Sequence, residues 1–262
     1  MLDSLKYVEN LERRLEKYLP PEQPRLRAKP LPPVPWPKFA PRTRIRSGKQ
    51  MIRFIPYRYQ SLIIDLFNRH RGILVVKTRQ LGVTECFANR FLQRAYENPA
   101  YAAVVFSRHQ EDSSNVQRRF SLMAGSANIP LPINGATRCQ LTNGAQAFFR
   151  PSTDDAGRSL ESIHDALFDE AGFVANMAKL YGAASPSQNV LGEDARTAVV
   201  STPNGLGGFF WQLLCDNNPP NMDVLAICEG VREGKLFSND LPGFYWFCDR
   251  SGWVKVFLHW LA

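Results

Sequence analysis

A short apolar run, a glycine-containing loop and a helical pattern follow one another between residues 72 and 95. The run at residues 72–76 is rich in β-branched side chains, which predicts a strand. In the stretch 83–95, Phe87, Phe91 and Leu92 recur at helical spacing. A strand, a tight loop and a helix in this order predict one unit of an α/β fold.

The same alternation continues along the chain. Residues 58–71 have the pattern of a helix that precedes the first strand. Further apolar runs typical of strands occupy residues 102–106, 145–149, 163–168 and 197–200, with helical or irregular segments between them. This alternation predicts an α/β domain with a mainly parallel central sheet flanked by helices on both faces.

The first fifty residues differ from the rest in charge and composition. Residues 5–19 carry an apolar stripe at helical spacing, which predicts a short amphipathic helix. The stretch 20–41 contains nine prolines, so we expect an extended segment there. Residues 1–50 hold twelve Lys/Arg and five Asp/Glu, a net charge of +7 out of +8 for the chain. This basic arm indicates either a nucleic-acid partner or a solubilising or docking tail.

We expect three regions: the helix and basic Pro-rich arm at 1–50, one α/β domain at 51–242, and a linker or the start of a further domain at 243–262. The last region is aromatic and apolar up to the final residue, which suggested the edge of another domain. No stretch approaches the roughly 18 apolar residues of a membrane-spanning helix, so we expect no membrane partner.

The loop after the first strand carries groups that suit a nucleotide phosphate. A phosphate site needs backbone N–H groups at a helix amino terminus, a cation, and a hydroxyl for magnesium. Gly82 and Thr84 match the second glycine and the hydroxyl of the G-x-x-x-x-G-K-[ST] pattern, but Val83 occupies its lysine position. Lys77, at the end of the strand, can supply the cation instead. The candidate binding segment is Lys77, Thr78, Arg79, Gln80, Leu81, Gly82, Val83, Thr84 and Glu85.

Two adjacent acids, Asp169 and Glu170, end the apolar run at 163–168. Hydrolysis of ATP needs one carboxylate to hold magnesium and a second to orient and deprotonate water. An acidic pair at a strand end fits both tasks, although such a pair also occurs as a helix cap. Asp165 interrupts the apolar run, and we expect it to face outward at the start of the strand.

The order of these motifs resembles that of the ATPase domain of the terminase large subunit family. In that family the lysine comes early in the phosphate loop, as Lys77 does here, and the acidic pair is its Walker B motif. The resemblance implies Thr84 and Asp169 as magnesium ligands and Glu170 as the catalytic base. It also implies that Tyr59 and Gln60 contact the adenine.

Two further elements follow from the resemblance. Arg158 stands where the family has an arginine finger that reaches into a neighbouring subunit, and Arg79 in the phosphate loop is the competing candidate. The family's coupling motif corresponds to Ser201, Thr202 and Pro203 after the last predicted strand. Small hydroxyls there can sense the γ-phosphate, although Pro-Asn-Gly chemistry also makes an ordinary turn.

Membership of this family implies a RecA/ASCE-type P-loop NTPase that uses ATP and Mg²⁺ to translocate double-stranded DNA into a procapsid. The implied partners are the portal protein, the small terminase subunit and further copies of the chain in a ring. The implied location is the cytoplasm of the infected host cell, with transient attachment to the procapsid. The resemblance also implies that residues 243–262 are a linker or the start of the family's carboxyl-terminal nuclease domain. No cluster of carboxylates like that of the nuclease follows Gly205, so we expect no nuclease activity from this chain.

Two other functions share some of these features. A superfamily 2-like DNA helicase or translocase has a similar loop, acidic pair and Ser-Thr-Pro motif, but it carries a second RecA-like domain for which this chain is too short. A non-catalytic DNA-binding or portal-docking module could retain a degenerate nucleotide fold, and the unusual lysine position favours it. Hydrolysis of ATP distinguishes the two enzymes from the module.

Overall fold

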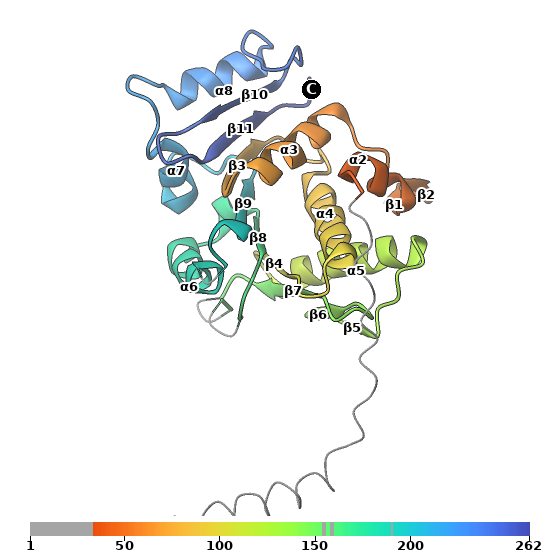
Figure 1. Cartoon of the computed structure of the whole chain (residues 1–262). Coiled ribbons are helices and arrows are strands. Elements are labelled where there is room, and N and C mark those ends of the chain that lie inside the picture. The colour runs from red at the N-terminus through yellow and green to blue at the C-terminus, as the bar shows by residue number, and fades with distance from the viewer. Residues whose placement is uncertain (1–33, 154–155, 158–159, 190) are drawn as a thin grey trace, which may run out of the picture.

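The computed structural model describes residues 34–153, 156–157, 160–189 and 191–262. A nine-stranded sheet forms its centre, with helices against both faces (Figure 1). Across the sheet the strands are β10 (Phe244–Cys248), β11 (Val254–Leu258), β3 (Gly72–Lys77), β9 (Arg196–Ser201), β8 (Asp165–Asp169), β4 (Ala102–Ser107), β7 (Gln146–Pro151), β6 (Arg138–Gln140) and β5 (Ile133–Gly135).

The strands from β11 to β7 run parallel to their neighbours, whereas the two edges of the sheet are antiparallel. Every residue of β3 and β8 is buried, as is typical of parallel strands covered on both faces. The expected mainly parallel sheet is therefore confirmed. Strand β9 lies between β3 and β8, so the strands that lead into the phosphate loop and the acidic pair are separated by one strand.

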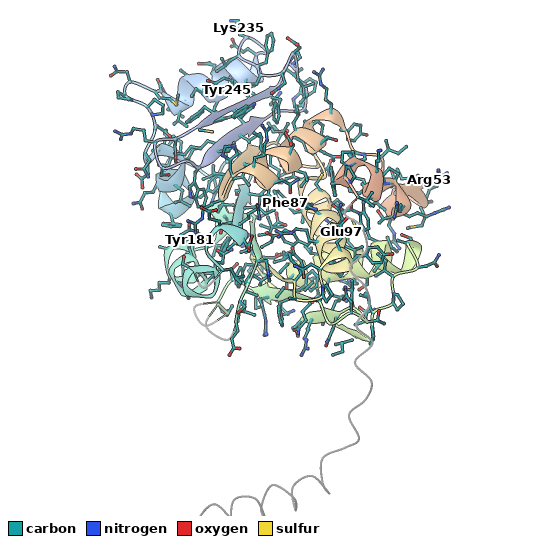
Figure 2. All side chains as sticks on the ribbon, in the orientation of Figure 1. Arg53, Phe87, Glu97, Tyr181, Lys235 and Tyr245 are labelled. Atoms are coloured by element: carbon teal, nitrogen blue, oxygen red, sulfur yellow. The ribbon has the colours of Figure 1, made fainter. Side chains whose placement is uncertain are left out.

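Helices cover the two faces in separate groups. One group is α3 (Arg58–Arg69), α4 (Val83–Glu97) and α5 (Gln110–Ser126), and the other is α6 (Met177–Asn189), α7 (Gly208–Cys215) and α8 (Val224–Arg232). Ile73 and Val75 of β3 pack with the first group, and Leu74 with the second, because successive side chains of a strand point to opposite faces. Phe87 of α4 is buried inside the first group, 5.2 Å from Phe67 between ring centroids (Figure 2).

The basic arm enters the domain before residue 51. Its described part leads through four short elements, α2 (Trp36–Phe39), η1 (Ala40–Arg42), β1 (Arg44–Ser47) and β2 (Gln50–Arg53). Trp36 and Phe39 are buried, and Trp36 Nε1 donates a 3.0 Å hydrogen bond to Asn89 Oδ1 of α4. The packed domain therefore begins earlier than the expected boundary. The predicted helix at 5–19 lies outside the described residues.

Residues 243–262 join the central sheet, which corrects the expectation of a linker or a second domain. Strand β11 pairs in parallel with β3, from Val254 opposite Ile73 to Leu258 opposite Lys77. Strand β10 then pairs with β11 at the sheet edge. The apolar composition of this region thus reflects burial within the same core. Within the described part of the chain, no helix has the length and hydropathy needed to cross a lipid bilayer.

Candidate active site

The predicted motifs meet at one edge of the sheet. Strands β3, β8, β9 and β4 are parallel, so their carboxyl ends lie side by side. The phosphate loop follows β3, the acidic pair ends β8, the coupling motif follows β9, and Ser107 ends β4. Residues separated by more than one hundred positions in the sequence therefore line one crevice.

The phosphate loop is a tight turn that opens α4. Gln80 and Gly82 have left-handed φ angles of 65° and 64°, and Gly82 caps the helix. A Cβ on residue 82 would lie 2.9 Å from Gln60 Nε2, so a side chain there would displace the glutamine. Val83, in the usual lysine position, is buried in the core, which leaves no room for a cation at that point.

Tyr59 and Gln60 brace this loop from α3. Tyr59 Oη and Gln60 Nε2 both donate to the Leu81 carbonyl, at 3.0 and 3.1 Å. Gln60 Oε1 accepts from the Tyr57 backbone N–H at 2.9 Å, and burial raises the pKa of Tyr59 to about 12. The exposed ring of Tyr57 stacks on Tyr59, with centroids 5.6 Å apart. The pair suggested for adenine contact therefore holds the loop in shape and lines the groove beside it.

Lys77 lies at the carboxyl end of β3 and points across the sheet edge. Its Nζ forms a 2.8 Å ion pair with Glu170 Oε1, and the lysine side chain is 6% exposed. Thr78 follows with its backbone N–H bonded to the Leu258 carbonyl, and its buried hydroxyl has no partner among the described residues. A buried hydroxyl without a partner at such a loop is available to form a hydrogen bond with a ligand.

Asp169 and Thr84, the two residues expected to hold magnesium, lie in contact with each other. The Thr84 hydroxyl lies 3.1 Å from both carboxylate oxygens of Asp169. Burial, and next the charge of Glu170, raise the pKa of Asp169 to about 6, against the opposing effects of Lys77 and Thr84. A desolvated carboxylate beside a hydroxyl suits Mg²⁺, which binds proteins through one or two carboxylates and completes its shell with water and substrate phosphates.

Glu170 is held from two sides in a left-handed backbone conformation, φ 51°. Lys77 binds one carboxylate oxygen, and the backbone N–H and hydroxyl of Thr202 donate to the other at 3.2 Å each. Burial alone would raise the pKa of Glu170, but the hydrogen bond and charge of Lys77, with the Thr202 bonds, leave it below the usual value. Glu170 is therefore charged at neutral pH, as a base must be.

The coupling motif contacts the acidic pair directly. The Ser201 hydroxyl accepts from the Gly172 N–H at 3.0 Å and donates to the Thr202 carbonyl at 2.8 Å. Asn204 Nδ2 donates to the Gly172 carbonyl at 2.8 Å, and Pro203 is exposed. The segments after β8 and β9 are thus joined by hydrogen bonds, and Glu170 and Thr202 belong to this network.

The two candidate fingers differ in what the structure shows. Arg79 is exposed on the phosphate loop. Arg158 lies outside the described residues. Glu85, the last residue of the candidate binding segment, forms a 3.0 Å ion pair with Arg119 of α5.

Sequence reasoning did not find the other residues that line the crevice, and it misplaced Asp165. Arg119 and Ser107 line a cavity of about 130 Å³ beside Asp169 and Glu170, and no motif marks either of them. Asp165 is fully buried, not outward-facing as we expected. Arg94 Nη1 and Tyr101 Oη bind its carboxylate inside the domain, at 2.6 Å each.

A wider groove of about 720 Å³ adjoins this cavity. Its floor is the phosphate loop, and its outer wall is the β1–β2 hairpin of the basic arm. The lining includes Tyr57, Tyr59, Gln60 and Glu85, and Arg119 borders both spaces. The groove is lined by the phosphate-loop residues Gln80, Leu81 and Gly82, and the smaller cavity is lined by Asp169 and Glu170. Together the two spaces suit a nucleotide whose terminal phosphate points toward the acids.

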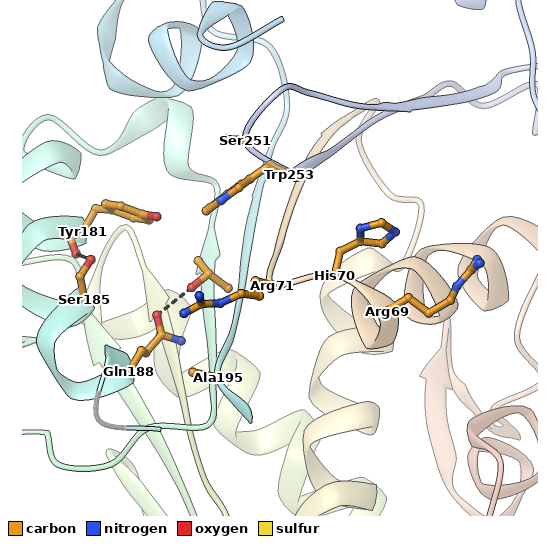
Figure 3. A pocket seen from close by; sticks show the side chains of 11 residues that line it. Arg69, His70, Arg71, Tyr181, Ser185, Gln188, Ala195, Ser251 and Trp253 are labelled. Carbon is orange, nitrogen blue, oxygen red and sulfur yellow. Dashed lines mark hydrogen bonds between the residues drawn. The ribbon is translucent and has the colours of Figure 1, made fainter. Parts of the chain in front are cut away.

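A further pocket, of about 430 Å³, lies at the opposite ends of β3 and β9 (Figure 3). Arg71 points into it, and Thr197 Oγ1 donates to Gln188 Oε1 at 2.7 Å on its wall. Tyr181 and Trp253 supply aromatic surface. Among the described residues its lining includes no carboxylate, whereas the crevice contains the acidic pair.

Solved structures of two phage large terminases resemble this chain. Among solved structures, the large terminase ATPase domain of Thermus phage P74-26 is 12% identical with a TM-score of 0.53, and the match covers 64% of this chain and 73% of that one. The large terminase of bacteriophage HK97 is 15% identical with a TM-score of 0.57, and the match covers 72% of this chain and 45% of that one. At these identities the likeness shows a shared fold.

Sequence comparison supplies the family. No curated protein matches the chain. The family model for the terminase large subunit, T4likevirus-type, N-terminal, matches residues 74–218, more than half of the chain and the whole stretch from the phosphate loop to the coupling motif. The chain therefore belongs to the family of T4likevirus-type terminase large subunit amino-terminal domains.

Proposed function

We propose that this domain is the ATPase of a viral DNA-packaging motor, which hydrolyses ATP to drive double-stranded DNA into a procapsid. The observation that carries the proposal is the convergence of Lys77, Thr84, Asp169 and Glu170 at one sheet edge, with the lysine 2.8 Å from the base. Family membership supports the packaging role, and the geometry supports the chemistry.

ATP binds with its phosphates on the backbone N–H groups of the loop at the start of α4, where the helix dipole favours negative charge. Lys77 exchanges its contact with Glu170 for the β- and γ-phosphates. Thr84 and Asp169 would hold Mg²⁺, which would neutralise charge on the phosphates. The adenine occupies the groove beside Tyr57 and Tyr59.

Glu170 acts once Lys77 has moved. Its freed carboxylate accepts a proton from a water molecule, whose oxygen attacks the γ-phosphorus. The bond from that phosphorus to the bridging oxygen breaks, and ADP and inorganic phosphate result. Thr202, which donates two hydrogen bonds to Glu170, senses the loss of phosphate and passes it to the segment after β9.

Assembly completes the motor in this proposal. Several copies form a ring on the portal protein around DNA, with the small terminase subunit delivering the DNA end in the host cytoplasm. Arg158 of one copy enters the crevice of the next, with Arg79 as the alternative finger. DNA contacts are mainly to phosphates and weaken with salt. The match to the HK97 large terminase covers under half of that protein, so activities of whole terminases are part of the proposal.

The test is ATP hydrolysis measured against protein concentration for the wild type, Lys77→Ala, Glu170→Gln and Arg158→Ala, with and without DNA and portal. We expect turnover that rises more than linearly with concentration and is lost in all three variants. Turnover that is linear in concentration and unaffected by Arg158→Ala would contradict the finger in trans. No turnover under any condition, together with DNA binding, would favour a non-catalytic module.

A further inference from the structure

Arg119 is the cation at the junction of the two spaces of the crevice. It borders the wide groove together with the phosphate-loop residues Gln80, Leu81 and Gly82. It also borders the small cavity that contains Asp169 and Glu170. Among the described residues, Arg119 is the one that lines both spaces.

Arg119 forms a weak ion pair with Glu85. Its Nη1 lies 3.0 Å from Glu85 Oε1, with side chains 48% and 23% exposed. A partly exposed ion pair of this kind contributes little stability, so it breaks at small cost. Glu85 sits next to Thr84 in the first turn of α4, where its charge also interacts favourably with the helix dipole and does not depend on the arginine.

Two observations indicate that the small cavity receives a polar group. The side chain of Ser107 lines it, is 2% exposed, and has a hydroxyl without a hydrogen-bond partner among the described residues. The charge of Arg119 already acts on Asp169, where it lowers the pKa against the larger raising effects of burial and Glu170. The cavity of about 130 Å³ is thus lined by this hydroxyl, by Arg108 and Arg119, and by Asp112, Asp169 and Glu170. Of the two arginines, Arg119 is the one that also borders the wide groove.

We propose that Arg119 is a γ-phosphate-binding residue that acts within its own subunit and is held by Glu85 until ATP arrives. This inference rests on the proposed ATPase function. When ATP fills the crevice, the guanidinium leaves Glu85 and binds the terminal phosphate beside Asp169 and Glu170. ADP has no group in that position, so Arg119 returns to Glu85. The residue therefore distinguishes the two nucleotides, a task that Lys77 and the loop alone perform less sharply because they also hold the β-phosphate.

The experiment compares binding of a non-hydrolysable ATP analogue and of ADP, each with Mg²⁺, to the wild type and Arg119→Ala. We expect Arg119→Ala to weaken binding of the analogue by about tenfold or more, the size of a lost hydrogen bond to a charged group, and binding of ADP by less than about threefold. Arg119→Lys keeps the charge but not the two-pronged geometry, and it should recover part of the loss.

Arg118→Ala is the matched control, because Arg118 is the adjacent arginine of the same helix and donates to Asn115 at 2.6 Å. It should leave both affinities unchanged. Glu85→Gln tests the exchange from the other side: it frees Arg119, so the analogue should bind about threefold tighter relative to ADP. This second variant keeps the proposal testable if Arg119→Ala fails to fold.

The outcomes separate this inference from the proposed function. If Arg119→Ala weakens the analogue and ADP equally, or weakens neither, while the wild type hydrolyses ATP, the role of Arg119 is overturned and the ATPase stands. An unchanged ratio of analogue to ADP affinity in Glu85→Gln would likewise overturn the exchange. A wild type that binds neither nucleotide would overturn the proposed function and this inference together.

Discussion

Lys77 and Glu170 form a 2.8 Å ion pair across the end of β9, the strand that separates β3 from β8. In the proposed mechanism Lys77 binds the phosphates and Glu170 activates water, so this ion pair joins the two groups that the reaction needs. Binding of ATP would then break the contact and free the base, and substrate binding and activation of Glu170 would be one event.

The first prediction concerns the lysine. Lys77→Ala should lower ATP turnover by about a hundredfold or more, because the phosphates lose a positioned, buried cation. Steady-state phosphate release measures it. Lys235→Ala is the control, since Lys235 is an exposed lysine that pairs with the nearby Glu233 and is not part of the candidate site. Turnover that survived Lys77→Ala would assign the cation to another residue, with Arg79 the first to test.

The second prediction concerns the pH dependence of stability, measured by urea unfolding without metal. The pKa of Asp169 is raised from 3.8 to about 6, so between these values the folded protein binds a proton that the unfolded chain does not. The charged group thus costs stability above pH 6, and the cost falls as the pH falls through 6. Asp169→Asn should raise the free energy of unfolding by about 2 kcal/mol at pH 7.5, and this gain should shrink by about 1 kcal/mol at pH 5.

Glu170→Gln is the matched control for Asp169→Asn. Glu170 is the next residue in the chain, and its pKa is shifted in the opposite direction, downward. The charged carboxylate contributes stability above its usual pKa, which is lost only as the pH falls through the lowered folded value. Glu170→Gln should therefore destabilise the protein at pH 7.5, with nearly the same deficit at pH 5. Equal signs for the two variants would contradict the assigned shifts.

The third prediction concerns the contact between the acidic pair and the coupling motif. A Cβ on residue 172 would lie 2.9 Å from Ser201 Oγ and 3.4 Å from the Thr202 carbonyl. Gly172→Ala should displace Thr202, which orients Glu170, and lower turnover by about tenfold or more while ATP affinity changes little. Gly182→Ala is the control, since a Cβ there meets nothing within 4 Å. Equal turnover in both variants would show that the motif tolerates displacement.

Much of the fold can be predicted from local sequence patterns. The five strands predicted from apolar runs are present as β3, β4, β7, β8 and β9, and the helices predicted around residues 58 and 83 are present as α3 and α4. Because parallel strands share one carboxyl edge, the sequence also brings Lys77, Thr84, Asp169 and Glu170 together in advance. Each of these residues lies at the end of a strand or the start of a helix that the local periodicity predicts.

The rest depends on contacts between distant segments. Pairing of Val254 with Ile73 across the sheet cannot be read from an aromatic run, which suits a core strand and a domain linker equally well. Burial of Trp36 on Asn89 likewise requires a partner 53 positions away. The Arg119–Glu85 contact joins α4 and α5, and the sequence alone does not show that these two helices pack together. The prediction that Asp165 faces outward was wrong for the same reason, since its buried partners come from other elements.

The last prediction concerns these partners, which tie the helix after the phosphate loop to the strand of the acidic pair. Asp165 is fully buried at the start of β8; Arg94 of α4 pairs with its Oδ1 and Tyr101 Oη donates to its Oδ2, both at 2.6 Å. Arg94→Met would leave a buried carboxylate without its cation, so it should lower the free energy of unfolding by about 3 kcal/mol. In Arg94→Met with Asp165→Asn the charge is gone as well, and the double variant should lose at least about 1 kcal/mol less than the sum of the single losses. Urea unfolding at pH 7.5 measures all three. Strict additivity would mean that the two side chains act independently, and α4 would then be held to β8 by its apolar contacts alone.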